Sequence, residues 1–586
     1  MVLILDDALE CQRFACKYGI SSNFGSNDNN GRDPAKQFPV NFNSPIIEKL
    51  KPTTIGSLSP VNVHVRATQI KKIRHSKLSK LIKSQHQIKS SKNVRLSENS
   101  KKTCIFGCGT FFVLLAISVG LLWPIISNHY LQKELELKKG SMNYNNWIET
   151  PIPMYLRFTM FHWQNPQEMF NKSSKPHFIE MGPYVFLEKH KRVNVTFNSN
   201  NDTVSFDQIR TWHFVPEMSN GTLDDNVTNI NVIAATTAFS LRFSNPIVKW
   251  AANRALKIMK EDVVITKTVR ELLFDGYEDQ LLSWVKKFRI PGIKVPPFKK
   301  FGWFVDRNGS YTYDGHFEMY SGHSDLTRMG LLTKWNYVNR TSFYNGPCGD
   351  VNGTTAELWP TNINATGELT LFVADLCRPL TLTYKQEHER LGVTGSRWVG
   401  DYRVFDNGKN YPPNKCFCTG PKSSCPDLLA GVHNMSDCRY GAPVFASFPH
   451  FHLADSKYVN AIDGLKPQEN KHEFSISLEP ITGIPLEIDA KIQINMHLQP
   501  IDGFSMYKNV PNVMIPAFWF AQTLELDEKL ARNAKIALQL PSIGTYVAFG
   551  VSGLGLILLI VGTILTLSKT WNNYQNLDDE LTASTS

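Results

Sequence analysis

The sequence predicts an α+β membrane protein in which two transmembrane helices flank a large antiparallel domain outside the cytoplasm. Three observations support this prediction. Two uncharged apolar runs lie far apart in the 586-residue chain. Glycosylation sequons and an even number of cysteines fall between these runs. Segments in which apolar and polar residues alternate occupy the same region. Together the observations indicate a glycoprotein with two membrane spans.

The first 103 residues are predicted to be a basic, largely disordered cytoplasmic arm. Residues 1–65 are rich in Asn, Ser and Pro and have little periodicity, which is typical of disorder. Residues 1–103 hold 18 of the 63 basic and 7 of the 52 acidic residues, so they carry the whole net charge of +11. Nucleic acid is not predicted as a partner, because an apolar run follows the arm. Residues 66–102 are either a basic helix on the anionic inner leaflet or a solvated tail.

Residues 104–126 and 543–567 are uncharged, and each run is long enough to cross a hydrocarbon core about 30 Å thick as a helix. The first run is no cleavable signal peptide, because it is too long and about 100 residues precede it. Twelve Lys and Arg residues and one acidic residue lie from Arg66 to Lys102, and the positive-inside rule therefore places the arm in the cytoplasm. The tail, 568–586, is then also cytoplasmic, and 127–542 lies outside.

Glycosylation sequons test this topology independently. The N-x-S/T pattern occurs ten times between the two spans, whereas the Asn-rich arm contains none. The segment 127–542 is therefore predicted to be a glycosylated ectodomain. The acceptor residues are Asn171, Asn194, Asn201, Asn220, Asn226, Asn308, Asn339, Asn352, Asn364 and Asn434.

Six cysteines lie in the ectodomain, and an even number in an oxidising compartment is typical of disulfide bonds. They are Cys348, Cys377, Cys416, Cys418, Cys425 and Cys438. A zinc site would need reduced thiolates, and the spacing matches no common ligand pattern. Sequence alone allows many pairings of these cysteines. Cys104 and Cys108, at the cytoplasmic edge of the first span, are either acylation sites or small residues packed in a membrane helix.

Most of the ectodomain is predicted to form antiparallel strands. Apolar residues alternate with polar neighbours in 488–498, 474–478 and 193–197, as expected of a sheet with one buried face. Residues 230–290 break this pattern and are predicted to be helical. Within them, basic and polar residues recur at the spacing of one helix face, and apolar residues that include Ile247 and Ile258 follow another face. The basic face consists of Lys249, Asn253, Lys257 and Lys260.

That basic face is either a docking surface for an anionic ligand or an ordinary solvated face. No G-x-S-x-G, H-E-x-x-H or P-loop pattern occurs, so neither an enzyme, a catalytic residue nor a cofactor is predicted. His450 and His452 are two residues apart and could bind a metal together with Asp455, but a structural role is favoured and no metal is predicted. The tail sequence YQNL, from Tyr574 to Leu577, either binds clathrin adaptors as a sorting motif or is a chance match.

Seven stretches between about 104 and 570 are specific enough to indicate a family. They are PIPMYLRFTMFHWQNPQEMFN, EMGPYVFLE, TVRELLFDGYEDQLL, FVADLCRP, GAPVFASFPHFHLAD, IDGLKPQENKHEFSISLEPITG and INMHLQP. The order of the six cysteines, with its C-x-C pair, is a further motif. In these motifs the chain resembles the class B scavenger receptor family, which includes fatty-acid translocase, the high-density-lipoprotein receptor and a lysosomal integral membrane protein. Members of that family usually begin a few residues before the first span, so the arm lies outside the resemblance.

The resemblance implies a β-barrel-like ectodomain with an apical helical bundle at about 230–290 and an internal apolar tunnel that leads toward the bilayer. Family members bind lipids, fatty acids, lipoproteins or anionic particles at the apex and pass lipid down the tunnel. The apical ligand-binding residues expected here are Lys257 and Lys260, with Lys249 beside them. The disulfides that the resemblance implies are Cys348–Cys416, Cys377–Cys438 and Cys418–Cys425.

The predicted function is therefore that of a receptor which binds lipid or lipoprotein and passes lipid toward the membrane without covalent chemistry. The predicted location is the plasma membrane, with both termini cytoplasmic. One alternative is a lysosomal or endosomal protein that escorts a lumenal protein and exports lipid. Another is an adhesion or phagocytic receptor without lipid transport. The ligand and the oligomeric state, with a homo-oligomer as one alternative, stay open.

Overall fold

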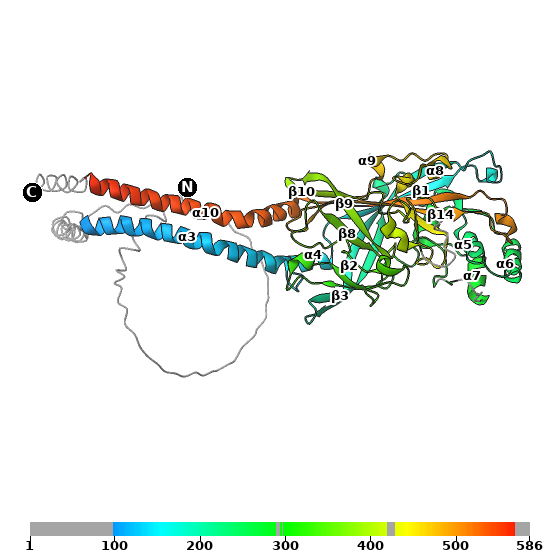
Figure 1. Cartoon of the computed structure of the whole chain (residues 1–586), viewed down its shortest axis with the longest axis horizontal. Helices are drawn as coiled ribbons and strands as arrows, with labels where there is room; N and C mark the ends of the chain where they lie inside the picture. The colour runs from blue at the N-terminus through cyan, green and yellow to red at the C-terminus, as the bar shows by residue number, and fades with distance from the viewer. Residues whose placement is uncertain (1–97, 289–293, 296, 419–427, 569–586) are drawn as a thin grey trace, which may run out of the picture. The chain divides into compact units, whose positions relative to one another are not determined.

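The computed structural model describes residues 98–288, 294–295, 297–418 and 428–568 (Figure 1). These residues form two compact units. The sheet unit is Leu122–Gly544, and the span unit comprises the described parts of Met1–Leu121 and Thr545–Ser586. Each unit has its own internal packing.

Two long helices contribute to both units. Helix α3 (Glu98–Leu135) and helix α10 (Glu528–Leu567) are each long and apolar enough to cross a membrane. Both extend beyond the predicted spans, because the flanking segments LQKEL and EKLARNAK are rich in good helix formers. Within the span unit they approach closely at two glycines, since a Cβ added to Gly555 would lie 2.9 Å from the Gly109 carbonyl oxygen. The membrane boundaries within these helices stay predictions.

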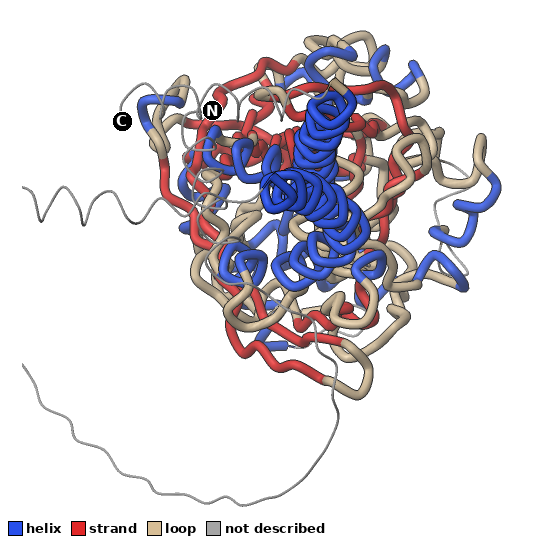
Figure 2. The backbone as a smooth tube through the Cα atoms, turned by 90° about the vertical axis from the view of Figure 1, so that its left-hand side faces the viewer, coloured by secondary structure: helices blue, strands red, loops and turns tan. Residues whose placement is uncertain are grey.

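One large antiparallel sheet forms most of the sheet unit. Its strands are β1 (Met154–Trp163), β2 (Phe178–Asn198), β3 (Thr203–Phe214), β6 (His316–Tyr320), β7 (Leu332–Trp335), β8 (Glu368–Val373), β9 (Arg378–Arg390), β10 (Val393–Val399), β11 (His433–Asn434), β12 (Val444–Ser447), β13 (Ser475–Leu478), β14 (Pro485–Leu498) and β15 (Val513–Glu525). In the described residues these 13 strands follow the order β7-β6-β3-β2-β1-β15-β14-β13-β10-β9-β8, with β12 joined to β14 and β11 to β12. Figure 2 shows strands all around the sheet unit, with loops and short helices between them.

The two end strands of this sheet, β7 and β8, are joined through one short segment. Leu332 N donates to Gly353 O at 2.8 Å, and Phe372 N donates to Thr354 O at 2.7 Å. The segment at 353–354 therefore lies between the two edges and nearly closes the sheet, which leaves little free strand edge. The α+β class and the barrel-like antiparallel sheet predicted from the sequence are confirmed.

Strand β14 is more deeply buried than its alternating sequence predicts. Its apolar residues point inward as expected, but the polar residues Gln493 and Asn495 between them are buried as well. A loop covers their face of the strand, because His450 N donates to Gln493 Oε1 at 2.7 Å. Asn495 Nδ2 donates to Ser447 Oγ at 3.0 Å. Each buried amide therefore has a hydrogen-bond partner, which removes the cost of burying it.

Short helices and one hairpin complete the sheet unit. They are α4 (Met142–Ile148), α5 (Val232–Ser240), α6 (Pro246–Ile258), α7 (Gln280–Phe288), α8 (Ser456–Asn460), α9 (Glu469–His472) and the hairpin of β4 (Asn226–Ile230) and β5 (Val264–Thr268). Helices α5, α6 and α7 gather at one end of this unit, here called the helical end (Figure 1). Asn231 and Asn245 cap α5 and α6, since each side chain accepts a hydrogen bond from the first helical turn.

Two disulfide bonds occur in the described residues, Cys348–Cys416 and Cys377–Cys438. They are two of the three pairings that the family resemblance implies. The half-cystines Cys348 and Cys377 belong to a second buried cluster, separate from the main core inside the sheet, and Phe417 packs there with them. The third pairing, Cys418–Cys425, stays a prediction because Cys425 lies outside the described residues.

Candidate functional site

Two cavities lie inside the sheet unit and adjoin each other. The helical-end cavity measures about 170 Å³ and is lined by α5, α7 and the segment 298–307. The base cavity measures about 290 Å³ and is lined by strands β1, β2, β14 and β15 and by residues of α3 and α10. Five residues line both cavities and are here called the junction. They are Phe304, Arg307, Asp375, Ile492 and Phe520.

The inner faces of β14 and β15 supply a continuous apolar wall. Ile488, Ala490 and Ile492 line the base cavity, and Ile492 and Ile494 line the helical-end cavity. These residues alternate along β14, so they share the face of the strand that points inward. Phe518 and Phe520 do the same on β15. The alternation recognised in the sequence therefore builds one side of both cavities.

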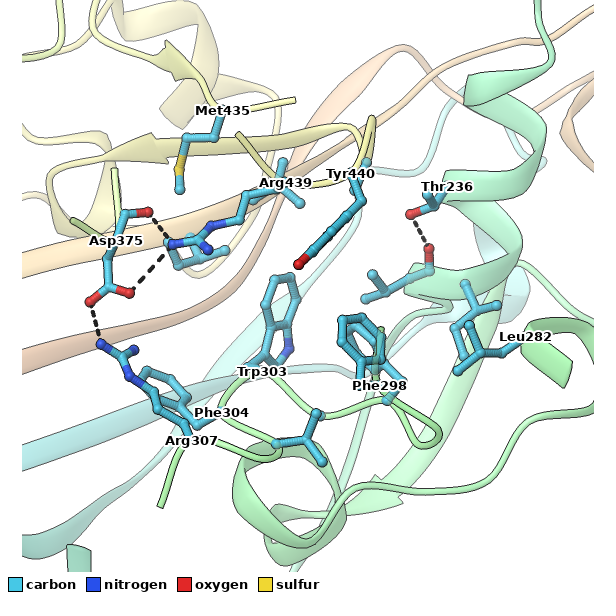
Figure 3. Close-up of a pocket in the computed structure, with 18 of the residues that line it drawn as sticks. Thr236, Leu282, Phe298, Trp303, Phe304, Arg307, Asp375, Met435, Arg439 and Tyr440 are labelled. Atoms are coloured by element: carbon cyan, nitrogen blue, oxygen red, sulfur yellow. Dashed lines mark hydrogen bonds and ion pairs between the residues drawn. The ribbon is translucent and has the colours of Figure 1, made fainter. Parts of the chain in front are cut away.

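Aromatic side chains form the opposite wall of the helical-end cavity. Figure 3 shows Phe298 between Trp303 and Leu282 of α7, with Phe304 on the other side of Trp303, next to Arg307. The ring of Trp303 lies 5.2 Å from that of Phe518, and the ring of Phe304 lies 5.0 Å from that of Phe158. These edge-to-face contacts hold the segment 298–307 against the sheet. The lining is therefore apolar and rigid on two sides.

A third side of the junction is charged. Arg307 Nη2 donates to Asp375 Oδ2 at 2.7 Å and to Asp314 Oδ1 at 3.2 Å. Asp375 Oδ1 also lies 3.4 Å from Arg439 Nη2, and Arg210 Nε donates to Asp314 Oδ2 at 2.6 Å. Figure 3 shows Asp375 between Arg307 and Arg439. A carboxylate thus ties together three loops that are far apart in the sequence.

Arg307 and Asp375 stay ionised although they are enclosed. The Arg307 side chain is only 3% exposed, and burial alone would lower its pKa, but the charges of Asp375 and Asp314 more than offset this and raise it. Burial acts to raise the pKa of Asp375, yet Arg307 and Arg439 outweigh it and hold that pKa below its usual value. The junction therefore presents fixed charges to an otherwise apolar space.

The base cavity carries a second charged group on β2. Glu188, His190 and Arg192 alternate along that strand and share one buried face. His190 Nε2 lies 2.6 Å from Glu188 Oε1, and its Nδ1 contacts Glu357. Arg192 pairs with Glu357 and donates from Nη1 to Trp147 O at 2.8 Å. Each ring nitrogen of His190 therefore meets a carboxylate.

Part of the predicted basic face of helix α6 is exposed and part is covered. Lys257 and Lys260 are exposed, but Lys249 lies over a neighbouring loop, where its side chain approaches to 2.9 Å of a Cβ added to Gly503. Next to it, Asn253 Oδ1 accepts from Ser505 N at 2.9 Å. The predicted face is thus half covered.

The exposed face of α6 is apolar as well as basic. Ile247, Trp250 and Ile258 are 78%, 68% and 68% exposed, and Arg254 and Lys257 lie among them. Sequence periodicity had assigned Ile247 and Ile258 to a face separate from the lysines. Ala252, Ala255 and Leu256 are the residues that α6 buries. Small residues allow α6 to pack closely, so its large apolar side chains remain at the surface.

Comparison with known proteins identifies the family. The model of the CD36 family matches residues 107–566. The chain belongs to the CD36 family. Similar proteins include Protein peste of Drosophila melanogaster, 36% identical over 411 residues, which are 69% of this chain and 72% of that protein. Scavenger receptor class B member 1 of Bos taurus is 30% identical over 473 residues, 80% of this chain and 90% of that protein.

Another relative carries a different name. Lysosome membrane protein 2 of Homo sapiens is 27% identical over 488 residues, which are 82% of this chain and 98% of that protein. The resemblance to class B scavenger receptors found in the sequence is therefore confirmed. Two of these relatives of the CD36-family chain bear the names of a receptor and a membrane protein.

Other predicted site residues of this CD36-family chain lie away from the cavities. Nine of the ten sequon asparagines are exposed, whereas Asn434 is half-buried and accepts hydrogen bonds from Ser436 N and Oγ. Glycosylation stays a prediction. Cys104 and Cys108 are half-buried on α3, and their acylation stays a prediction too. Tyr574 and Leu577 lie outside the described residues.

His450 is held by hydrogen bonds and ring stacking in the structure. Its Nε2 donates to Glu180 Oε1 at 2.8 Å and its Nδ1 accepts from Lys466 N at 3.0 Å. The ring also stacks on His472, with centroids 4.3 Å apart. His452 instead lies near Phe448, at 6.4 Å between ring centroids. Across the described residues, no group of three or more His, Cys, Asp or Glu side chains is arranged to hold a metal ion.

Proposed function

We propose that this chain is a membrane receptor that takes up lipid at the helical end and passes it through the two adjoining cavities toward the membrane. The observation that carries the proposal is the pair of apolar cavities that share Phe304, Ile492 and Phe520. A long alkyl chain gains about 0.8 kcal/mol for each CH₂ removed from water, so such a lining favours lipid. The name of the relatives, scavenger receptor class B member 1, supports a receptor role.

The exit is proposed to lie at the base cavity. Leu135 of α3 and Leu530, Ala534 and Ala537 of α10 line this cavity. Both helices also contain the candidate membrane spans. A lipid that reaches the base cavity therefore touches the helices that lead into the bilayer, which supports delivery to the membrane without full exposure to water.

The entrance surface is proposed to be the exposed face of α6. An anionic lipid surface, such as that of a lipoprotein or a membrane fragment, would meet Trp250 and Ile247 as apolar contacts and Arg254, Lys257 and Lys260 as cations. Each Lys or Arg near an anionic surface contributes about 1 kcal/mol. Lys249 contributes less in this proposal, because its stem lies over the Gly503 loop.

The entrance is tested by reversing charge on α6. The double variant Lys257→Glu/Lys260→Glu, expressed as the full chain on cells, should bind phosphatidylserine vesicles about 10-fold or more weakly than the natural chain. The matched control Lys466→Glu/Lys471→Glu reverses two exposed charges elsewhere on the sheet unit and should bind normally. Equal binding by all three proteins would remove α6 as the entrance.

The path is tested by blocking the junction. Ile492→Trp puts a larger side chain where the cavities meet, whereas Ile481→Trp makes the same change at an exposed loop residue. Cells that express Ile492→Trp should bind labelled vesicles normally but take up a labelled long-chain fatty acid no faster than cells without the receptor. Uptake equal to that of Ile481→Trp would contradict passage through the junction, provided that both variants reach the surface.

The proposed location is the plasma membrane with both termini cytoplasmic. The alternative is an endosomal or lysosomal protein that escorts a lumenal protein and exports lipid, which the similarity to lysosome membrane protein 2 supports. The YQNL sequence in the tail would then recruit clathrin adaptors. Localisation of the tagged chain with and without Tyr574→Ala separates the two, since loss of the motif should shift an internal protein to the cell surface.

A further inference from the structure

The balance of charged lining residues differs between the two cavities. In the helical-end cavity the charged lining residues are Lys294, Arg307, Arg439 and Asp375, so cations are in excess. In the base cavity the charged lining residues are Arg192, Arg210, Arg307, Glu188, Asp314, Glu357 and Asp375, and His190 lies between two of these carboxylates, so cations are not in excess there. An anionic head group is therefore attracted more strongly on the helical-end side of the junction.

We propose that Arg439 and Arg307, held side by side by Asp375, bind the carboxylate of a long-chain fatty acid on the helical-end side of the junction. The inference rests on the proposed lipid path and names the class of lipid that the path retains. The alkyl chain lies against Phe298, Trp303 and Leu282 in the same cavity (Figure 3).

Arg439 has donors available for such a ligand. In the described residues its side-chain hydrogen bonds leave from Nη2 alone, to the main-chain oxygen of Asp375 and to Asp375 Oδ1 at 3.4 Å. Its Nε and Nη1 groups, which point to different sides of the guanidinium, are therefore left, and either can donate a charge-assisted hydrogen bond to a second carboxylate. The side chain is 29% exposed and lines the helical-end cavity, so a ligand inside the cavity can reach these donors.

Arg307 is the fixed partner in this site. It is almost fully buried, paired with both Asp375 and Asp314, and packed against aromatic rings, with its guanidinium carbon 5.0 Å from the Tyr313 ring centroid and 5.1 Å from that of Phe304. Asp375 is 31% exposed and lines both cavities. Asp375 is thus shared by two guanidinium groups, and because it is the one carboxylate that pairs with Arg439 in the described residues, a ligand carboxylate can pair with Arg439 as well.

The consequence is selection by head group. A fatty acid carboxylate is held at Arg439, because the base cavity has no excess of cations to attract it further. A neutral lipid with the same alkyl chain has no such partner at the junction. The small helical-end cavity also suits one alkyl chain better than the two chains of a phospholipid.

The experiment measures binding of oleate and of oleyl alcohol, which has the same chain length and no charge, to the full chain in phosphatidylcholine nanodiscs at pH 8. Empty nanodiscs correct for partition into lipid. Arg439→Gln should weaken oleate binding about 10-fold or more and change oleyl alcohol binding less than about two-fold. Arg439→Lys, which keeps the charge without the additional guanidinium donors, should bind oleate with intermediate affinity.

A matched control lies in the same cavity. Lys294 lines it too but pairs with Asp437 at 3.6 Å, so Lys294→Gln should change the ratio of the two affinities less than about two-fold. Oleyl alcohol binding also reports that each variant is folded. If Arg439→Gln weakens both ligands equally or neither, the carboxylate site is wrong while the lipid path stands. If the natural chain binds neither ligand, the lipid path fails as well.

Discussion

His433 is expected to make the sheet unit less stable in acid. The residue is buried beside the disulfide-bonded cluster, where Arg378 Nη1 lies 3.2 Å from its Nδ1. Arginine only donates, so Nδ1 accepts and the ring carries its proton on Nε2, which lies 2.9 Å from the Tyr344 hydroxyl. That hydroxyl donates in turn to Leu376 O at 3.0 Å. Protonating Nδ1 would therefore break the network beside a fixed positive charge.

The size of the effect follows from the difference in proton binding. Burial, and then the charge of Arg378, hold the pKa of His433 well below 6.5, its value in an unfolded chain. Below pH 6.5 His433 binds a proton in the unfolded state but not in the folded state, so the free energy of unfolding falls as the pH falls. Each pH unit costs about 1.4 kcal/mol, and the step from 6.5 to 5.0 therefore costs about 2 kcal/mol.

The assay is urea unfolding of the full chain in detergent at pH 7.5 and pH 5.0, followed by tryptophan fluorescence. The natural chain should lose about 2 kcal/mol more between these pH values than His433→Gln does. The readout is the change with pH, so a constant loss from the substitution itself cancels. His213→Gln, at an exposed position on β3, is the matched control and should behave like the natural chain. Equal pH dependence of His433→Gln and the natural chain would refute the reasoning.

Two further predictions concern the fold. Replacing Cys377 and Cys438 together by alanine opens a link between residues 61 apart, and this should lower the free energy of unfolding by about 4 kcal/mol; an unchanged urea midpoint would show that the link constrains little. Gly464 has φ of +100° and a Cβ there would lie 1.9 Å from Phe178 O, whereas Gly140 has φ of +93° and open space around it. Gly464→Ala should therefore lower the thermal midpoint much more than Gly140→Ala does. The Gly140→Ala variant should cost about 1 to 2 kcal/mol, from backbone strain alone. Equal shifts of the two midpoints would contradict the close approach of residue 464 to Phe178 O.

The cavity wall on β14 was predictable from sequence, but the charged junction was not. Alternation in 488–498 places Ile488, Ile492 and Ile494 on one inner face, because side chains of a strand point to opposite sides in turn. Arg307, Asp375 and Arg439 come from three loops and have no spacing that links them. The site exists only because the fold brings these three residues together. Of the three, Asp375 lies within FVADLCRP, one of the stretches that indicate the family.

Helix α6 shows a second limit of sequence patterns. Periodicity separated Ile247 and Ile258 from the lysines, whereas in the structure these residues are exposed together with Lys257. It also could not tell which face the rest of the protein covers. Ala252 and Ala255 are buried because they let the helix approach closely, and Ile247 and Trp250 are left exposed. Disulfide connectivity has the same origin, since the pairing of six cysteines depends on which loops the fold brings together. The resemblance to class B scavenger receptors, not the spacing of the cysteines, narrowed the possible pairings.

The central claim is that lipid travels inside the sheet unit, and photolabelling tests it most directly. The full chain in nanodiscs is exposed to a fatty acid with a photoreactive group on its alkyl chain, and labelled residues are mapped by mass spectrometry. The account predicts labels on Phe298 and Trp303 in the helical-end cavity and on Ile488 and Leu524 in the base cavity, with the base labels lost in Ile492→Trp. Labels confined to exposed residues such as Trp250, with none inside the sheet, would contradict it.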